Sequence, residues 1–201
     1  MKPKTIKKEL NRLQDRWLKT IKDEELVKST RKDMIVTGGS IASMLLGEDV
    51  NDYDIYFTTA STINKIAKYY LAALKKISKV HETSRIHNFK GKNEIACMEN
   101  EFVKSKTGRL KIFVPSTGYI KINAKKSKAF EPIFASSNAI MLKGKIQLVL
   151  RFWGKPGQIH ENYDFVHCLS YYYQRDLVQF ETQHNCVLLI ATYNDQPLAG
   201  L

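Results

Sequence analysis

Two short segments of this 201-residue chain carry residue types that can bind and activate phosphate groups. Gly38, Gly39 and Ser40 follow a short apolar run, and paired glycines allow a turn whose backbone approaches a ligand closely. If a helix begins at Ser40, its free backbone N–H groups point at the turn and favour a bound phosphate. The Ser40 hydroxyl would add another donor. The sequence therefore predicts a phosphate-binding turn.

A pair of carboxylates, Asp52 and Asp54, follows this turn. Side chains alternate along a strand, so both carboxylates project from the same face of the strand expected over 52–57. Carboxylate oxygens are ligands that Mg²⁺ prefers, and two such ions can activate an attacking oxygen and stabilise a leaving one. Phosphoryl transfer needs mainly positioning and neutralisation of charge. We therefore expect a bound divalent cation, Mg²⁺ or Mn²⁺, beside a phosphate group.

The elements that must hold these residues can be predicted from apolar spacing. Apolar residues recur every three or four positions near the N-terminus, which predicts an amphipathic helix over 4–28. The run 34–37 is typical of a buried strand that enters a tight turn. A short helix is expected from Ser40 to Leu46, because Ser40 can cap it and Gly47 can end it.

The pattern weakens after another helix, which is expected over 63–77. A lysine-rich insertion or second small lobe is expected over about 81–134, and convincing strands follow at 139–142 and 146–152. Further strands are expected at 111–114, 119–123 and 163–168. The order of elements indicates an α/β or α+β sheet with helices mainly on one face.

The chain is expected to divide into an N-terminal helix (1–30), a catalytic core (31–170) that carries the insertion, and a C-terminal extension (171–201). The extension could be helix or strand. It leaves little room for a further domain, so the protein is either a minimal version of its class or continues beyond Leu201.

Basic residues dominate, since 32 Lys and Arg face 20 Asp and Glu and give a formal net charge of +12. This excess favours a polyanionic partner such as nucleic acid or a nucleotide. No apolar stretch approaches the roughly 20 residues of a membrane-spanning helix, and no signal core follows the basic N-terminus. A cytoplasmic protein without a membrane partner is expected. The three cysteines are scattered, which argues against a disulfide framework and a zinc ribbon.

The turn and the acidic pair resemble the signature of nucleotidyltransferases with the DNA polymerase β fold. That signature is a hydrophobic residue, then Gly and Gly or Ser, then two acidic residues on the next strand. The matching residues are Val36, Gly38, Gly39, Ser40, Asp52 and Asp54. The stretch 38–57 looks like the poly(A) polymerase and CCA-adding branch, and 162–167 looks like a segment of phage- and virus-encoded members. The resemblance implies a polymerase β-like fold in which the turn holds the nucleotide and the acidic pair is catalytic.

A third metal-binding and catalytic carboxylate is implied by the same resemblance, and Asp164 is the candidate. It lies in the alternating stretch 163–168, after the strand at 146–152, as the order of the fold requires. Asp164 would orient or deprotonate the incoming hydroxyl. The alternative is that Asp164 caps a turn or pairs with Arg151.

These residues imply a metal-dependent, template-independent enzyme that transfers a nucleoside monophosphate from an NTP to a hydroxyl and releases pyrophosphate. RNA, tRNA included, is the expected acceptor because the chain is basic. Two alternatives stay open: transfer to a protein target, as in toxins, and a catalytically inactive protein that binds nucleic acid or joins a virion. Further residues that could contact nucleotide or RNA, or could equally be ordinary surface or core residues, are Lys121, Lys125, Lys143, Arg151, Trp153 and the tyrosines 171–173.

Overall fold

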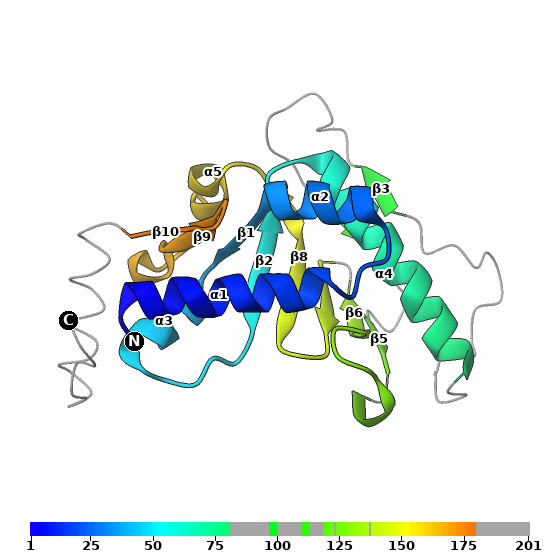
Figure 1. The fold of residues 1–201 in the computed structure, drawn as a ribbon. Coiled ribbons are helices and arrows are strands. Elements are labelled where there is room, and N and C mark those ends of the chain that lie inside the picture. The colour runs from blue at the N-terminus through cyan, green and yellow to red at the C-terminus, as the bar shows by residue number, and fades with distance from the viewer. Residues whose placement is uncertain (81–96, 100–109, 113–118, 123, 137, 180–201) are drawn as a thin grey trace. The chain divides into compact units, whose positions relative to one another are not determined.

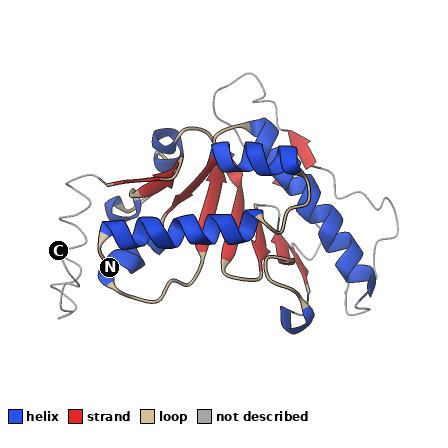
Figure 2. Ribbon diagram, in the orientation of Figure 1, coloured by secondary structure: helices blue, strands red, loops and turns tan. Residues whose placement is uncertain are grey.

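The protein was analysed as a computed structural model that describes residues 1–80, 97–99, 110–112, 119–122, 124–136 and 138–179 (Figure 1). The chain forms two compact units: Met1–Ile55 together with Lys155–Leu201 is unit 1, and Tyr56–Gly154 is unit 2. Helices and strands occur in both units, which confirms the predicted α+β class (Figure 2). Within the described residues, no helix is long and apolar enough to cross a membrane.

Unit 1 contains the predicted phosphate-binding turn and the acidic pair. Its elements are α1 (Pro3–Leu18), α2 (Glu24–Asp33), β1 (Met34–Thr37), α3 (Gly39–Leu46), α5 (Pro156–His160), the 3₁₀ turn η3 (Val166–Cys168), β9 (Tyr171–Tyr173), β10 (Asp176–Val178) and the start of β2 (Tyr53–Phe57). The strand order is β10-β9-β1-β2, and β9 is antiparallel to both β1 and β10. Because Tyr172 lies opposite both Val36 and Leu177, it occupies the middle of this sheet.

Unit 2 is built from α4 (Ala60–Val80) and a run of antiparallel strands. The strands are β5 (Tyr119–Lys121), β6 (Pro132–Ser136), β7 (Ala139–Leu142) and β8 (Ile146–Trp153), with the separate pair β3 (Cys97–Glu99) and β4 (Leu110–Ile112), and a 3₁₀ turn η2 at Ala124–Lys126. The turn between β7 and β8 places two residues at positive φ: Gly144 has φ +110° and Lys145 has φ +66°. α4 packs against β6 and β8, and its Ile63 and Ile66 are fully buried.

The predicted helix over 4–28 is in fact two helices, because a second cap interrupts it. α1 ends at Leu18, and the Thr20 hydroxyl donates back to the Trp17 carbonyl. Asp23 then caps α2 by accepting a hydrogen bond from the Leu26 backbone N–H at 3.0 Å. The periodic spacing of apolar residues continues across this break, because Ile21, which lies between the two helices, is also buried. An Asp followed by two glutamates is a start signal that the periodicity masked.

The strands predicted at 34–37, 139–142 and 146–152 and the helix over 63–77 are confirmed, with small shifts at their ends. The predicted strand at 163–168 is wrong. This stretch is a loop that ends in η3, and its backbone N–H groups bond locally, such as Cys168 N–H to the Phe165 carbonyl at 3.1 Å, rather than in a strand ladder. Most of the predicted insertion at 81–134 lies outside the described residues.

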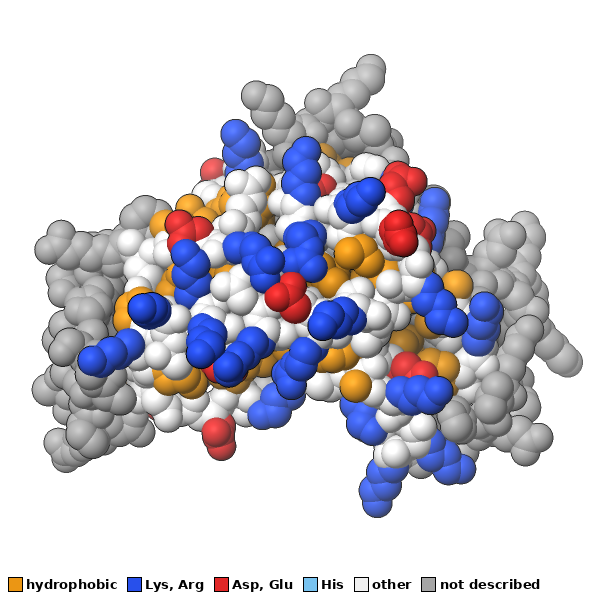
Figure 3. Space-filling view, viewed as in Figure 1, with side chains coloured by type: hydrophobic (Ala, Val, Ile, Leu, Met, Phe, Trp, Pro, Cys, Tyr) orange, Lys and Arg blue, Asp and Glu red, His pale blue; other side chains and the backbone are white. Residues whose placement is uncertain are grey.

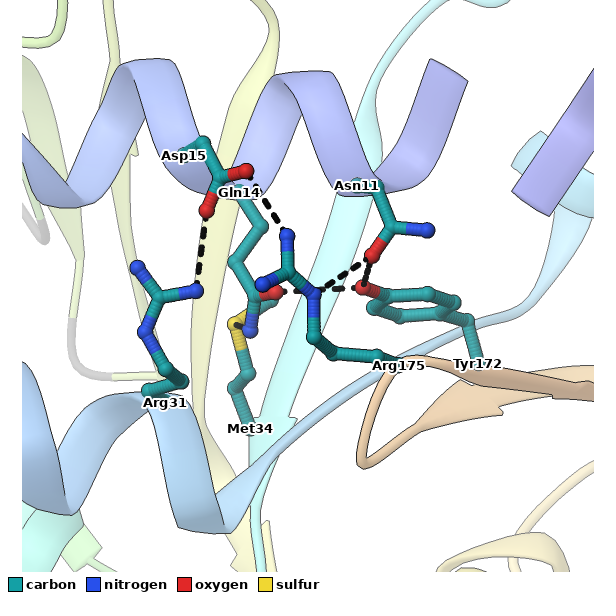
Figure 4. A network of polar contacts seen from close by, with 7 residues as sticks. All are labelled: Asn11, Gln14, Asp15, Arg31, Met34, Tyr172 and Arg175. Atoms are coloured by element: carbon teal, nitrogen blue, oxygen red, sulfur yellow. Dashed lines mark hydrogen bonds and ion pairs between the residues drawn. The ribbon is translucent and has the colours of Figure 1, made fainter. Parts of the chain in front are cut away.

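A polar network ties α1 to α2 and to the β9–β10 hairpin (Figure 4). Asp15 forms ion pairs with Arg31 at 2.8 Å and with Arg175 at 2.7 Å. The hydrogen bond from Arg31 and, less strongly, the charge and hydrogen bond of Arg175 lower the pKa of the Asp15 carboxyl. The Tyr172 hydroxyl donates to Asn11 Oδ1 at 2.8 Å. These bonds hold the β9–β10 hairpin against α1. Strand β9 pairs in turn with β1, the strand that leads into the predicted phosphate-binding turn.

Tyr172→Phe should lower the free energy of unfolding by roughly 1–3 kcal/mol. The Tyr172 hydroxyl lies 3.1 Å from Oε1 of Gln14, a side chain only 1% exposed, so its removal leaves a buried acceptor unsatisfied. Denaturant unfolding would measure the loss. Tyr173→Phe is the matched control, since its hydroxyl bonds only with the exposed side chain of Gln174 among the described residues. Equal losses in both variants would contradict the role of Gln14.

Candidate functional site

The turn predicted to bind phosphate is a strained junction between β1 and α3. Gly38 adopts φ +94° and ψ −158°, a conformation that residues with a side chain rarely adopt. A Cβ atom placed on Gly38 would lie 3.3 Å from Asp54 Oδ2 and 3.6 Å from the Tyr163 hydroxyl. Three segments therefore meet at this glycine: the turn, β2 and the loop after α5. We define the Gly38 site as a set of seven residues: Gly38, Asp54, Tyr163, Thr37, Ser40, His160 and Cys168.

Helix α3 begins directly after the turn, close to its predicted start. Gly38 is the cap residue rather than Ser40, and Gly47 ends the helix in the left-handed conformation, with φ +82°. Ser40 is only 5% exposed, and its hydroxyl has no hydrogen-bond partner within the described residues. A buried hydroxyl without a partner costs stability. The first turn of α3 thus carries free backbone N–H groups and an unsatisfied hydroxyl, both suited to an anionic oxygen.

The two predicted carboxylates lie where β2 begins. Asp54 is the second residue of β2, and Asp52 precedes the strand; both residues are half-buried. The Asp54 carboxylate is the acidic group next to Gly38. Its negative charge also contributes, after burial, to raising the pKa of the Cys168 thiol. Asp54 therefore places a negative charge beside both Gly38 and Cys168.

Thr37 and His160 fasten the loop after α5 to the turn. The Thr37 hydroxyl lies 2.8 Å from His160 Nε2, and it donates to the Ser170 carbonyl at 3.0 Å and the Cys168 carbonyl at 3.3 Å. The tautomer of the His160 ring determines which of the two groups donates in the bond between Thr37 and His160. The Gly38 N–H also donates to the Cys168 carbonyl, at 3.2 Å. The shape of the turn consequently depends on this loop.

Stability should fall as the pH drops below about 6.5, because burial lowers the pKa of His160 below its ordinary value. The unfolded chain then binds the imidazole proton more readily than the folded chain does. This contribution is complete above about pH 6.5 and is lost as the pH falls toward the folded pKa. Thermal melts from pH 5 to 8 would measure it, and His160→Gln should flatten the profile. An unchanged profile in His160→Gln would exclude His160 as the cause.

The predicted third carboxylate is placed differently from expectation. Asp164 is exposed and lies in a bend of the loop, not in a strand. Of the described residues, no group of three or more His, Cys, Asp or Glu side chains could hold a metal ion. Asp52, Asp54 and Asp164 therefore do not form such a group. Binding of Mg²⁺ or Mn²⁺ stays a prediction, and Asp54, beside the turn, is the residue best placed for it.

Four residues of the site were missed by sequence reasoning: Thr37, His160, Tyr163 and Cys168. His160 ends α5, and its ring packs against Tyr163 with centroids 5.2 Å apart. A start signal for α5 was present, since Pro156 stands at the first helical position and Gln158 bonds back to the Lys155 N–H at 2.9 Å.

The remaining candidates have ordinary surroundings where they are described. Tyr172 is fully buried and Trp153 is 8% exposed, so both are core residues. Lys121 and Lys125 are exposed. Lys143 donates to a backbone carbonyl, and the side chain of Arg151 lies outside the description.

The protein thus has an α+β fold, and its candidate site is a polar turn between a strand and a helix, with the Asp54 carboxylate beside it. The chain belongs to the Gabija anti-defense 2 family, whose family model matches residues 8–187. Neither the curated proteins nor the solved structures gave a match.

This family is not one of polymerase β nucleotidyltransferases, so the predicted membership is wrong. The predicted transfer of a nucleoside monophosphate to RNA is corrected with it, because the family description points to a role against phage defence. The physical reason is that the signature is short and local. A glycine turn followed by an acidic pair specifies a strand–helix–strand unit, and the carboxylate expected to complete the signature, Asp164, lies in a bend.

Proposed function

We propose that this chain counteracts the Gabija defence against phage. The observation that carries the proposal is the family match, which runs from residue 8 to residue 187 and so includes every residue of the Gly38 site. The match also covers most of both chain segments of unit 1, Met1–Ile55 and Lys155–Leu201, and both segments contribute residues to that site. The activity therefore belongs to a chain in which the site is intact.

We further propose that the Gly38 site is the centre of this activity and binds a phosphorylated ligand, a nucleotide being the simplest. Support comes from the free N–H groups at the start of α3 and from the unpartnered Ser40 hydroxyl. Because Gly38 has no side chain, the space beside the Asp54 carboxylate is open, and any side chain at position 38 would narrow it. Asp54, with Asp52, would hold a divalent cation that offsets the repulsion between carboxylate and phosphate. That the chain also acts as an enzyme on the bound ligand remains a prediction.

Phage plating tests the anti-defence activity directly. A phage that Gabija restricts would be plated on Gabija-positive cells and on Gabija-negative cells, each with the chain or with an empty vector. The chain should raise plating on Gabija-positive cells and leave it unchanged on Gabija-negative cells. Equal plating with chain and vector on Gabija-positive cells, at confirmed expression, would refute the proposal.

Ser40→Ala separates ligand binding from folding. Without ligand, the variant should be as stable as the wild type or slightly more stable, because it removes a buried hydroxyl that has no partner among the described residues. With ATP or GTP and Mg²⁺, the wild type should gain thermal stability through binding, and Ser40→Ala should gain less. Thermal shift measurements would record both. Identical shifts for the two proteins, or none for the wild type, would remove Ser40 and the nucleotide from the proposal.

A further inference from the structure

The outward face of α1, together with its C-cap residue Lys19, carries a row of cations that form no ion pair with any described acidic residue. Lys4, Lys8, Arg16 and Lys19 are all exposed, and none makes an ion pair in the described part of the chain. Their spacing of three, four or eight residues keeps them on one side of the helix. The opposite side of α1 carries buried residues: Ile6, Leu10, Leu13, Gln14, Trp17 and Leu18. We call these four cations the α1 basic row.

The acidic residues of α1 are already engaged. Glu9 pairs with Arg12 at 2.7 Å, and Asp15 pairs with both Arg31 and Arg175. Because one carboxylate, Asp15, pairs with two guanidinium groups, the cluster of Asp15, Arg31 and Arg175 has a net positive charge. Lysine and arginine side chains gather over the face that α1 and α2 present in Figure 3, with few acidic side chains among them. The α1 basic row thus belongs to a helix whose exposed face is rich in lysine and arginine.

Two of the four charges, those of Lys4 and Lys8, are placed against the stability of the helix, whereas Arg16 and Lys19 lie at the C-terminal end, where the helix dipole favours a cation. The first turn of α1 contains no acidic residue, and Lys4 stands where the helix dipole disfavours a cation. Lys4 and Lys8 are four residues apart, a spacing at which like charges repel. Helix stability therefore does not explain the placement of Lys4 and Lys8, whereas a polyanion laid along the helix would relieve the repulsion between them.

We propose that the α1 basic row binds the phosphate backbone of a nucleic acid. The sixteen residues of α1 extend about 24 Å, which matches roughly seven base pairs of a duplex. Contacts made by exposed lysines and arginines to phosphates release counterions and carry no base specificity. Binding should therefore be independent of sequence and should weaken steeply with salt. This surface is distinct from the Gly38 site and does not depend on the proposed anti-defence activity.

Fluorescence anisotropy with the full chain tests the proposal. The probes are a labelled DNA duplex of about 20 base pairs and a single-stranded RNA of equal length, titrated from about 50 to 200 mM salt. The test variant is Lys4→Gln/Lys8→Gln/Arg16→Gln/Lys19→Gln. The matched control removes four exposed lysines of unit 2: Lys68→Gln/Lys76→Gln/Lys126→Gln/Lys128→Gln. Circular dichroism and a thermal melt verify that both variants fold.

The test variant should bind at least one probe about tenfold or more weakly at low salt, and its slope of log K against log salt should flatten by up to three or four units. The control should change affinity less than about threefold. The two probes distinguish DNA from RNA. Equal losses in both variants, or unchanged binding by the test variant, would overturn the proposal. So would absence of binding by the wild type, or tighter binding to phosphatidylserine vesicles than to either nucleic acid.

Discussion

Gly38→Ala is expected to abolish the anti-defence activity. The substitution forces a side chain into φ +94° and places its Cβ 3.3 Å from Asp54 Oδ2. The turn must then move away from β2, which displaces the start of α3 and the carboxylate that we propose the site uses. Plating on Gabija-positive cells should fall to the level of the empty vector, while the protein is still detected in the cells.

The neighbouring glycine provides a matched control. A Cβ on Gly39 would meet nothing within 4 Å, and its φ lies outside the left-handed region. Gly39→Ala should therefore keep full activity and should be as stable as the wild type, because alanine favours the first turn of a helix more than glycine does. Full activity in Gly38→Ala, or equal loss in both variants, would contradict the role given to the turn.

Trp17→Ala is expected to lower the free energy of unfolding by about 3–5 kcal/mol, the largest stability effect that we predict. Trp17 lies on the inner side of α1, is 0% exposed and is the largest fully buried side chain of those described. The α1 helix contacts α2, β10 and α3, the helix that carries Ser40, so the cavity would open in the core of unit 1. Urea unfolding monitored by circular dichroism would measure the change.

Arg16→Ala serves as the control for this cavity. Arg16 precedes Trp17 on α1 but is exposed, so its truncation should change stability by no more than about 0.5 kcal/mol. A loss below about 1 kcal/mol in Trp17→Ala would show that the core of unit 1 repacks around the missing indole, contrary to our account.

The strand–turn–helix–strand unit could be predicted because its signals are local. The apolar run of β1, the paired glycines and Gly47 each act on their own neighbours in sequence, and these bounds were correct within a residue or two. The loop after α5 could not be predicted in this way. Its alternating apolar residues imitate a strand, but Phe165 and Val166 are 64% and 46% exposed.

For the same reason, only part of the Gly38 site could be predicted from the sequence. Gly38, Ser40 and Asp54 lie close together along the chain, whereas His160 and Tyr163 reach the turn only through folding of unit 1. A hydrogen bond between Thr37 and His160 spans 123 residues and leaves no periodic signal. The short motif was also too small to identify the family, which needed a match over most of the chain.

Asp54→Asn gives the most direct test of the claim that this chain counteracts Gabija through the Gly38 site. The amide preserves the shape of the side chain beside Gly38 and removes its charge. Plating of a restricted phage would be measured on Gabija-positive cells that express wild type or Asp54→Asn at equal protein levels. Our account predicts high plating with the wild type and vector-level plating with Asp54→Asn. Equal, high plating with both proteins would contradict it and would place the anti-defence activity elsewhere on the molecule.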